Sequence, residues 1–148
     1  ALPGGESLLQ KVRRLKAVSN KRVMIVEDNV AVARMFEVLI MDDAEVILAR
    51  DGEEGLSHIQ EGHFDLIVAD VIMPKMDGIE MYKKALSIDP KLEGLFIFFT
   101  GTEDPEELNF LQSSNVIVLP KPSPVNLICQ VIDQVLAKSS TRQNATVH

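Results

Sequence analysis

The sequence predicts an α/β protein in which helices cover both faces of a parallel β-sheet. From Arg22 onward, short runs rich in β-branched residues alternate with segments of helical period, and this alternation is typical of parallel sheets. Two of the runs are continuously apolar, as are central strands buried on both faces. The length of 148 residues suits a single domain with one hydrophobic core.

Five strands are expected, and each strand is followed by a helix. The first, second and fifth runs read RVMIVE, EVILA and VIVL, and the third and fourth, DLIVAD and LFIFFT, are the ones expected at the centre of the sheet. The predicted strands are 22–27, 45–49, 65–70, 95–100 and 116–119.

The segments between these strands have apolar residues at helical spacing. The last segment shows it most clearly, because Val125, Ile128, Ile132 and Val135 recur at intervals of three and four and form one stripe toward the sheet. Cys129 lies on that stripe, and we expect it to be a core thiol. The predicted helices are 30–41, 53–60, 79–87, 105–112 and 124–137.

Two segments flank the predicted domain, which covers residues 22–138. Residues 1–21 are basic and carry leucines and valines at helical spacing, so we expect a helical extension or linker. This extension would dock on the domain, pair with a second copy as a homodimer, or join a larger protein. Residues 139–148 are polar without periodicity and are predicted to be a disordered tail.

Charge and composition exclude several classes of protein. Residues 23–148 hold nine Lys and Arg against 21 acidic residues, and this negative charge argues against direct nucleic acid binding. No apolar run approaches the ~20 residues that span a bilayer, so membrane insertion is not expected. A single cysteine excludes an internal disulfide and fits a reducing compartment. We therefore expect a cytoplasmic protein.

Residues able to bind a metal and a phosphoryl group stand at the ends of four predicted strands. Glu27 and Asp28 follow the first strand, Asp70 ends the third, Thr100 ends the fourth and Lys121 follows the fifth. The carboxyl ends of parallel strands meet at one edge of a sheet, where ligands bind. We therefore expect these side chains to lie together.

These residue types in one place point to phosphoryl transfer. Crowded carboxylates repel one another, and a hard divalent cation relieves the repulsion. Mg²⁺ fits best, because it needs only one or two carboxylates and is the common metal of phosphoryl transfer. A carboxylate can form an aspartyl phosphate, and Asp70 is the best candidate for this. Lys121 and Thr100 would then stabilise the phosphoryl oxygens.

The same residues occur in motifs that resemble the receiver domain of two-component response regulators. The similarity runs over residues 22–138, with the motifs in family order. The resemblance implies a flavodoxin-like (βα)5 three-layer sandwich with strand order 2-1-3-4-5. The motifs are Glu27-Asp28-Asn29, DVIMPKMDG at 70–78, Thr100-Gly101 and Lys121-Pro122.

The resemblance also implies how the chain would act. Asp70 would accept a phosphoryl group from a phosphohistidine on a histidine kinase or a histidine phosphotransfer protein, so the chain would be a switch and not a turnover enzyme. Asp28, Asp70 and the backbone carbonyl of Ile72 would bind Mg²⁺, with Glu27 reaching the ion through water. Output would be contact with a downstream protein, or would belong to a longer parent chain such as a hybrid histidine kinase.

Around the phosphoryl group the resemblance implies two contacts and one backbone feature. Thr100 and Lys121 would contact the phosphoryl oxygens, and the small Gly101 would leave the site open. The Lys121–Pro122 peptide bond is expected to be cis.

Three residues depart from the usual pattern of the family. Glu27 replaces an aspartate that many relatives carry, and Ile72 is apolar where some relatives have a polar residue thought to assist hydrolysis of the phosphate. Val118 stands where relatives usually have Tyr or Phe, whose ring swings inward when the threonine moves. Val118 has no ring, so the resemblance does not extend to that route of output.

Two alternatives remain open. A Mg²⁺-dependent phosphatase of related topology would release phosphate catalytically, but its nucleophile motif has a second aspartate where this chain has Ile72. A receiver-shaped scaffold would bind partners without being phosphorylated, and the complete set of acids, Thr100 and Lys121 argues against it.

Overall fold

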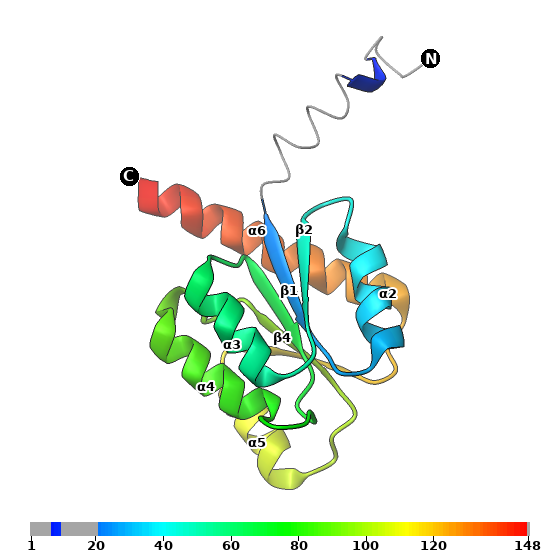
Figure 1. The fold of residues 1–148 in the computed structure, drawn as a ribbon, viewed down its shortest axis with the longest axis vertical. Coiled ribbons are helices and arrows are strands. Elements are labelled where there is room, and N and C mark those ends of the chain that lie inside the picture. The colour runs from blue at the N-terminus through cyan, green and yellow to red at the C-terminus, as the bar shows by residue number, and fades with distance from the viewer. Residues whose placement is uncertain (1–6, 10–20, 148) are drawn as a thin grey trace.

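Five parallel strands form one sheet in the predicted order β2-β1-β3-β4-β5 (Figure 1). The structure is a computed structural model that describes residues 7–9 and 21–147. Each strand overlaps its predicted range, and the last begins and ends one residue later than expected. The strands are β1 (Arg22–Val26), β2 (Glu45–Ala49), β3 (Leu66–Ala69), β4 (Phe96–Thr100) and β5 (Ile117–Pro120).

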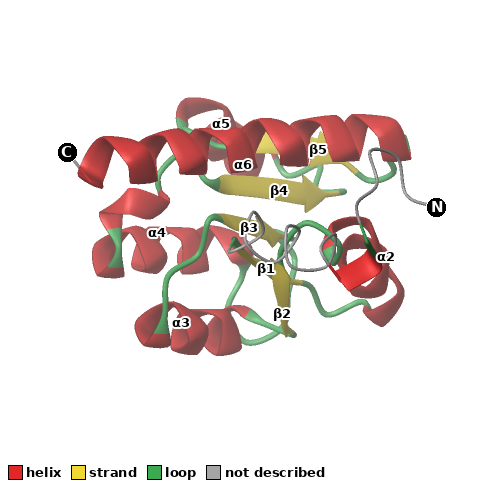
Figure 2. Cartoon of the chain, turned by 90° about the horizontal axis from the view of Figure 1, so that it is seen from above, coloured by secondary structure: helices red, strands yellow, loops and turns green. Residues whose placement is uncertain are grey.

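Helices cover both faces of this sheet. Strand order reverses after β2, and right-handed crossovers then place α2 on one face and α3, α4 and α5 on the other. Figure 2 shows α2 opposite α3 and α4, and in Figure 1 α6 passes on the far side of the sheet from α3 and α4. The helices are α2 (Val30–Ile40), α3 (Gly52–Glu61), α4 (Gly78–Ile88), α5 (Pro105–Ser113) and α6 (Val125–Val147), with a short 3-10 helix, η2 (Pro90–Leu92).

The core forms around the two strands predicted to be central. Every residue of β3 and β4 is buried, as their continuous apolar sequences indicate. On one face Phe36 packs edge-on against Phe99, with ring centroids 5.1 Å apart. On the other, Tyr82 of α4 packs edge-on against Phe96 at 4.8 Å and Phe98 at 6.0 Å. These aromatic contacts hold β4, and thus the end of the strand at Thr100, between both helical layers.

An Asp or Asn side chain caps the N-terminus of each helix from α2 to α5. Asn29 caps α2 by accepting hydrogen bonds from the N–H groups of Ala31 (3.0 Å) and Val32 (3.2 Å). The cap of α2 is therefore Asn29 and not Asp28, which does not serve the helix in this way. The remaining caps are Asp51 for α3, Asp77 for α4 and Asp104 for α5.

The flanking segments differ in part from expectation. Most of the predicted N-terminal extension, residues 1–6 and 10–20, lies outside the described residues. The sequence predicts a disordered tail from residue 139, whereas the structure describes α6 as continuing to Val147. Residues 138–147 contain neither Pro nor Gly, so nothing in them ends the helix. Cys129 is half-buried and not fully in the core.

Asp65 ties α6 to the edge of the sheet opposite the predicted site. Its buried carboxylate accepts hydrogen bonds from the Ser139 hydroxyl (2.5 Å) and the Arg22 N–H (2.8 Å), and His63 Nε2 lies 3.2 Å away. Burial raises the pKa of the Asp65 carboxyl, but the hydrogen bonds from Ser139 and Arg22 and the interaction with His63 outweigh it, so the pKa is lowered from 3.8.

Asp65→Asn should therefore destabilise the domain by about 2 kcal/mol at neutral pH, because the Arg22 N–H and the Ser139 hydroxyl lose a charged acceptor. A lowered pKa in the folded state stabilises the fold fully above the unfolded value of 3.8, and this contribution disappears as the pH falls through the folded value. Urea unfolding between pH 7 and pH ~3 checks this. Asp133→Asn, at an exposed residue of α6, is the control. A difference in the free energy of unfolding between Asp65→Asn and wild type that stays constant with pH would contradict the prediction.

Candidate phosphoacceptor and metal site

The acids of the predicted site lie where the strand order reverses. Asp70 directly follows β3 and Glu27 directly follows β1, and each extends the backbone ladder of its strand. The Glu27 N–H donates to the Ala49 carbonyl (2.9 Å), and the Asp70 N–H donates to the Val26 carbonyl (3.2 Å). These bonds fix both side chains at the carboxyl edge of the sheet, next to each other, as the sequence predicts.

Glu27, Asp28 and Asp70 form one cluster. Each offers a carboxylate oxygen, and these three oxygens all lie within 4.8 Å of one another. Glu27 and Asp70 are buried, with exposed fractions of 5% and 7%, whereas Asp28 is exposed. Hard oxygen donors gathered in this way fit a divalent cation such as Mg²⁺. Ile72, the fourth predicted metal-binding residue, donates its N–H to Asp70 Oδ1 (3.3 Å), so its backbone lies beside the cluster.

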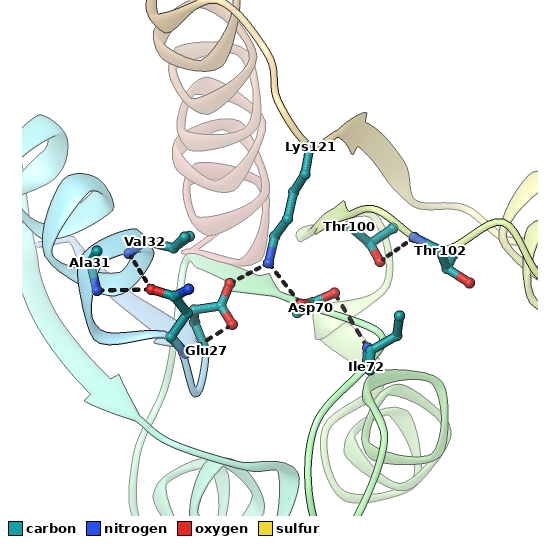
Figure 3. Close-up of polar contacts among 9 residues, drawn as sticks. Glu27, Ala31, Val32, Asp70, Ile72, Thr100, Thr102 and Lys121 are labelled. Carbon is teal, nitrogen blue, oxygen red and sulfur yellow. Dashed lines mark hydrogen bonds and ion pairs between the residues drawn. The ribbon is translucent and has the colours of Figure 1, made fainter.

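Lys121 joins two of these acids (Figure 3). Its Nζ lies 2.7 Å from Glu27 Oε1 and 2.8 Å from Asp70 Oδ2. The Lys121 N–H donates to the Thr100 carbonyl (3.0 Å), and the Lys121–Pro122 peptide bond is cis, as expected. The amine predicted to face the phosphoryl group therefore comes to the same edge of the sheet as Asp70.

The ion pairs at Lys121 compete with burial in setting the pKa values. Burial lowers the pKa of Lys121, but the hydrogen bonds and charges of Asp70 and Glu27 outweigh it and raise the pKa. Burial raises the pKa of Glu27, and the hydrogen bonds from Lys121 and Asn29 only partly oppose the effect. Lys121 is therefore held in its charged form between two acids.

Thr100 ends β4 and is buried, but its hydroxyl faces away from the acids. Its Oγ1 accepts a hydrogen bond from the N–H of Thr102 (3.2 Å), and Figure 3 shows this contact on the side away from Lys121. Among the described residues no hydrogen bond joins the Thr100 side chain to Asp70 or Lys121. The structure thus brings Glu27, Asp28, Asp70 and Lys121 together and places Thr100 at their border.

Comparison with known proteins agrees with this geometry. The family model described as "Response regulator receiver domain" matches residues 23–133, which is most of the chain. The chain belongs to the response regulator receiver family. The strand order and the alternation of strands and helices found here are those of the receiver fold.

Solved receiver domains resemble the chain over most of its length. A CheY-like receiver domain protein from Methanospirillum hungatei is 27% identical, with a TM-score of 0.75, and the match covers 84% of this chain and 99% of that one. The receiver domain of the hybrid histidine kinase CckA is 32% identical, with a TM-score of 0.63, over 78% of this chain and 98% of that one.

A curated relative is much longer than this receiver domain. The CAI-1 autoinducer sensor kinase/phosphatase CqsS of Vibrio cholerae serotype O1 is 28% identical over 104 residues, which make up 68% of this chain and 15% of the sensor kinase. The chain thus spans only a small part of that relative.

Within residues 7–9 and 21–147, no helix has the length and apolar character needed to cross a membrane.

Two features of the receiver site were not predicted from the sequence. The first is the bond between Glu27 and Lys121, which depends on the reach of both side chains across the sheet edge. The second is the contact of Thr102 with Thr100. The signal for this contact was Thr100 itself, since a Ser or Thr side chain often accepts a hydrogen bond from the backbone N–H two residues on.

Gly78, the first residue of α4, packs against the backbone of Asp70. A Cβ added at Gly78 would lie 2.1 Å from the Asp70 carbonyl oxygen, and the Gly78 N–H donates to the Val71 carbonyl (2.8 Å). The start of α4 therefore packs directly on the backbone of the predicted phosphoacceptor. Gly101 is different, because a Cβ there would meet only Lys121 Cβ at 3.8 Å, an ordinary contact.

Proposed function

We propose that this receiver domain accepts a phosphoryl group on Asp70 from a phosphohistidine of a histidine kinase or histidine phosphotransfer protein, in a reaction that depends on Mg²⁺. The observation that carries the proposal is the surroundings of Asp70: its carboxylate lies beside Glu27 and Asp28 and accepts hydrogen bonds from Lys121 (2.8 Å) and the Ile72 N–H (3.3 Å). A carboxylate held in this way is ready to act as a nucleophile.

In the transfer, an Asp70 carboxylate oxygen forms the new O–P bond as the N–P bond of the phosphohistidine breaks. The electron pair of that bond stays on the imidazole nitrogen of the donor. Negative charge spreads over the three remaining phosphoryl oxygens, and the Lys121 ammonium lies where it would neutralise part of that charge. The Thr100 hydroxyl would donate to one of these oxygens after leaving its present position.

The acid cluster fits a bound Mg²⁺ ion. Asp28, Asp70 and the backbone carbonyl of Ile72 would hold the ion, and Glu27 would reach it through water. When bound, Mg²⁺ supplies positive charge that shields the carboxylates and the incoming phosphoryl oxygens from one another. The chemistry of the donor set supports this, since all three side chains offer hard carboxylate oxygens.

The product would be a phosphorylated switch and not a turnover enzyme. We assign the receiver to residues 22–138 and place it in the cytoplasm, where a histidine kinase would supply the phosphoryl group. The downstream partner would be a protein, and the acidic charge of residues 23–148 argues against direct contact with nucleic acid. The likeness to a segment of a much longer sensor kinase supports a longer parent chain.

The test is incubation with a small phosphodonor such as phosphoramidate and Mg²⁺, followed by intact mass measurement. Wild type should gain one phosphoryl group, and the gain should disappear in Asp70→Asn or with a chelator. Asp77→Asn, at another carboxylate of the same loop, is the control and should still be phosphorylated. No gain in wild type would favour the scaffold, and repeated turnover of a phosphomonoester would favour the phosphatase.

A further inference from the structure

We infer that Thr102 and Glu107 are positioning residues that hold the Thr100 hydroxyl away from the phosphoryl site and couple its movement to the first turn of α5. This rests on the proposed function, because it concerns the state of Thr100 before Asp70 is phosphorylated. The juxtaposition that carries it is a chain of hydrogen bonds from the end of β4 to α5.

Thr102 uses both its backbone and its side chain in this chain of bonds. Its N–H donates to Thr100 Oγ1 (3.2 Å), which is the contact drawn in Figure 3. Its hydroxyl donates a hydrogen bond to Glu107 Oε1 (2.5 Å) and accepts one from the N–H of Asp104 (3.3 Å). Thr102 thus contacts Thr100 through its backbone, and through its hydroxyl it contacts Asp104 and Glu107 at the start of α5.

The hydroxyl of Thr102 completes the N-terminal cap of α5. The Asp104 carboxylate accepts the Glu107 N–H (3.0 Å), which is half of a capping box. In the usual box the Glu side chain returns to the N–H of the cap residue, but here the Thr102 hydroxyl lies between Glu107 and the Asp104 N–H. The α5 cap therefore depends on where Thr102 sits.

Phosphorylation would change that position. To donate to a phosphoryl oxygen on Asp70, the Thr100 side chain must turn toward the acids, with which it shares no hydrogen bond among the described residues. Its bond to the Thr102 N–H then strains or breaks, and Thr102 shifts relative to Glu107. Val118 on β5 carries no ring to swing, so the cap offers a route from Thr100 to the surface of α5 that needs no aromatic residue.

The hydrogen bond between Thr102 and Glu107 thus stabilises the unphosphorylated state relative to the phosphorylated state. Its removal should favour the phosphorylated form. Beryllofluoride with Mg²⁺ mimics a phosphoryl group on a carboxylate and is the probe. Thr102→Val removes the bond to Glu107 and the bond from the Asp104 N–H. Because each hydrogen bond is worth about 1 kcal/mol net, loss of the bond to Glu107 alone should make Thr102→Val bind beryllofluoride at least about fivefold more tightly than wild type. Thr102→Ser, which keeps the hydroxyl, should return the affinity toward the wild-type value.

Two acids in the first turn of α5 give a matched pair of variants. Glu107→Gln weakens the bond to Thr102, because a neutral acceptor is about half as strong, and should tighten binding about twofold. Glu106→Gln removes the same charge from an exposed side chain of the same turn and should leave the affinity unchanged. This pair separates the hydrogen bond from the general effect of charge.

NMR titration provides both readouts. In wild type the amide signals of Glu106 and Glu107 should shift on addition of beryllofluoride, and in Thr102→Val this shift should be smaller. Equal or weaker binding by Thr102→Val, or equal effects of Glu106→Gln and Glu107→Gln, would overturn the inference. If Thr102→Val fails to fold, the glutamine pair decides the question alone. A wild-type protein that shows no Mg²⁺-dependent shift at all would instead refute the proposed function.

Discussion

Gly78→Ala should destabilise the domain by about 3 kcal/mol, at the upper end of the cost of overpacking a core. The added Cβ would lie 2.1 Å from the Asp70 carbonyl oxygen, a separation that no rotamer change relieves because the atom it meets is backbone. Either α4 moves outward or Asp70 moves. We expect both a lower urea midpoint and slower phosphorylation of the protein that remains folded.

Urea unfolding and intact mass after treatment with a phosphodonor measure the two effects of Gly78→Ala. Gly101→Ala is a matched control at the same edge of the sheet, since its Cβ would meet only Lys121 Cβ at 3.8 Å. It should change stability by less than about 0.5 kcal/mol, as surface substitutions usually do. Equal stability of the two variants would show that α4 does not pack closely on the Asp70 backbone at Gly78.

Lys121→Met should slow phosphorylation of Asp70 about a hundredfold, because it removes a charge directed at the transferred group. The same change should strengthen Mg²⁺ binding about tenfold, since the buried Glu27 and Asp70 would lose their only close cation among the described residues. Without Mg²⁺ the two acids would repel each other. The fold should then be less stable by about 2 kcal/mol, a figure reduced from that of a fully buried pair because Lys121 is 26% exposed.

Rates from mass spectrometry and a Mg²⁺ titration followed by NMR check these opposite effects. Lys75→Met is the control, because Lys75 is an exposed cation of the neighbouring β3–α4 loop whose ion pair is with Asp51 and not with Glu27 or Asp70. It should change neither quantity more than about twofold, as expected for a surface ion pair. If Lys121→Met weakens Mg²⁺ binding, the amine does not compete with the ion.

The fold was predictable because its signals are local. Continuous apolar runs identified β3 and β4, and polar residues at strand ends identified the site, since parallel topology brings those ends together. The full length of α6 was not predictable from periodicity, because its final residues carry no apolar stripe.

Contacts made by long or rotatable side chains could not be predicted from the sequence either. The Lys121 amine reaches Glu27 as well as Asp70, and this depends on the separation of β1 and β5 across the sheet edge. The turn of Thr100 toward Thr102 depends on a hydroxyl rotamer. Residue type and order specify which groups meet at such an edge, while the partner of each group is settled by three-dimensional geometry.

The capped helix starts have an electrostatic consequence for the site. Helices α2, α3, α4 and α5 all begin at the sheet edge that carries Asp70, so the positive ends of their macrodipoles share that edge with the acids. Each such end is equivalent to about half a positive charge and acts over roughly one turn. The starts of α2, two residues after Asp28, and of α4, where Gly78 packs on the Asp70 backbone, lie next to the acids. An arriving phosphate therefore meets a field less repulsive than the formal charges of Glu27, Asp28 and Asp70 imply.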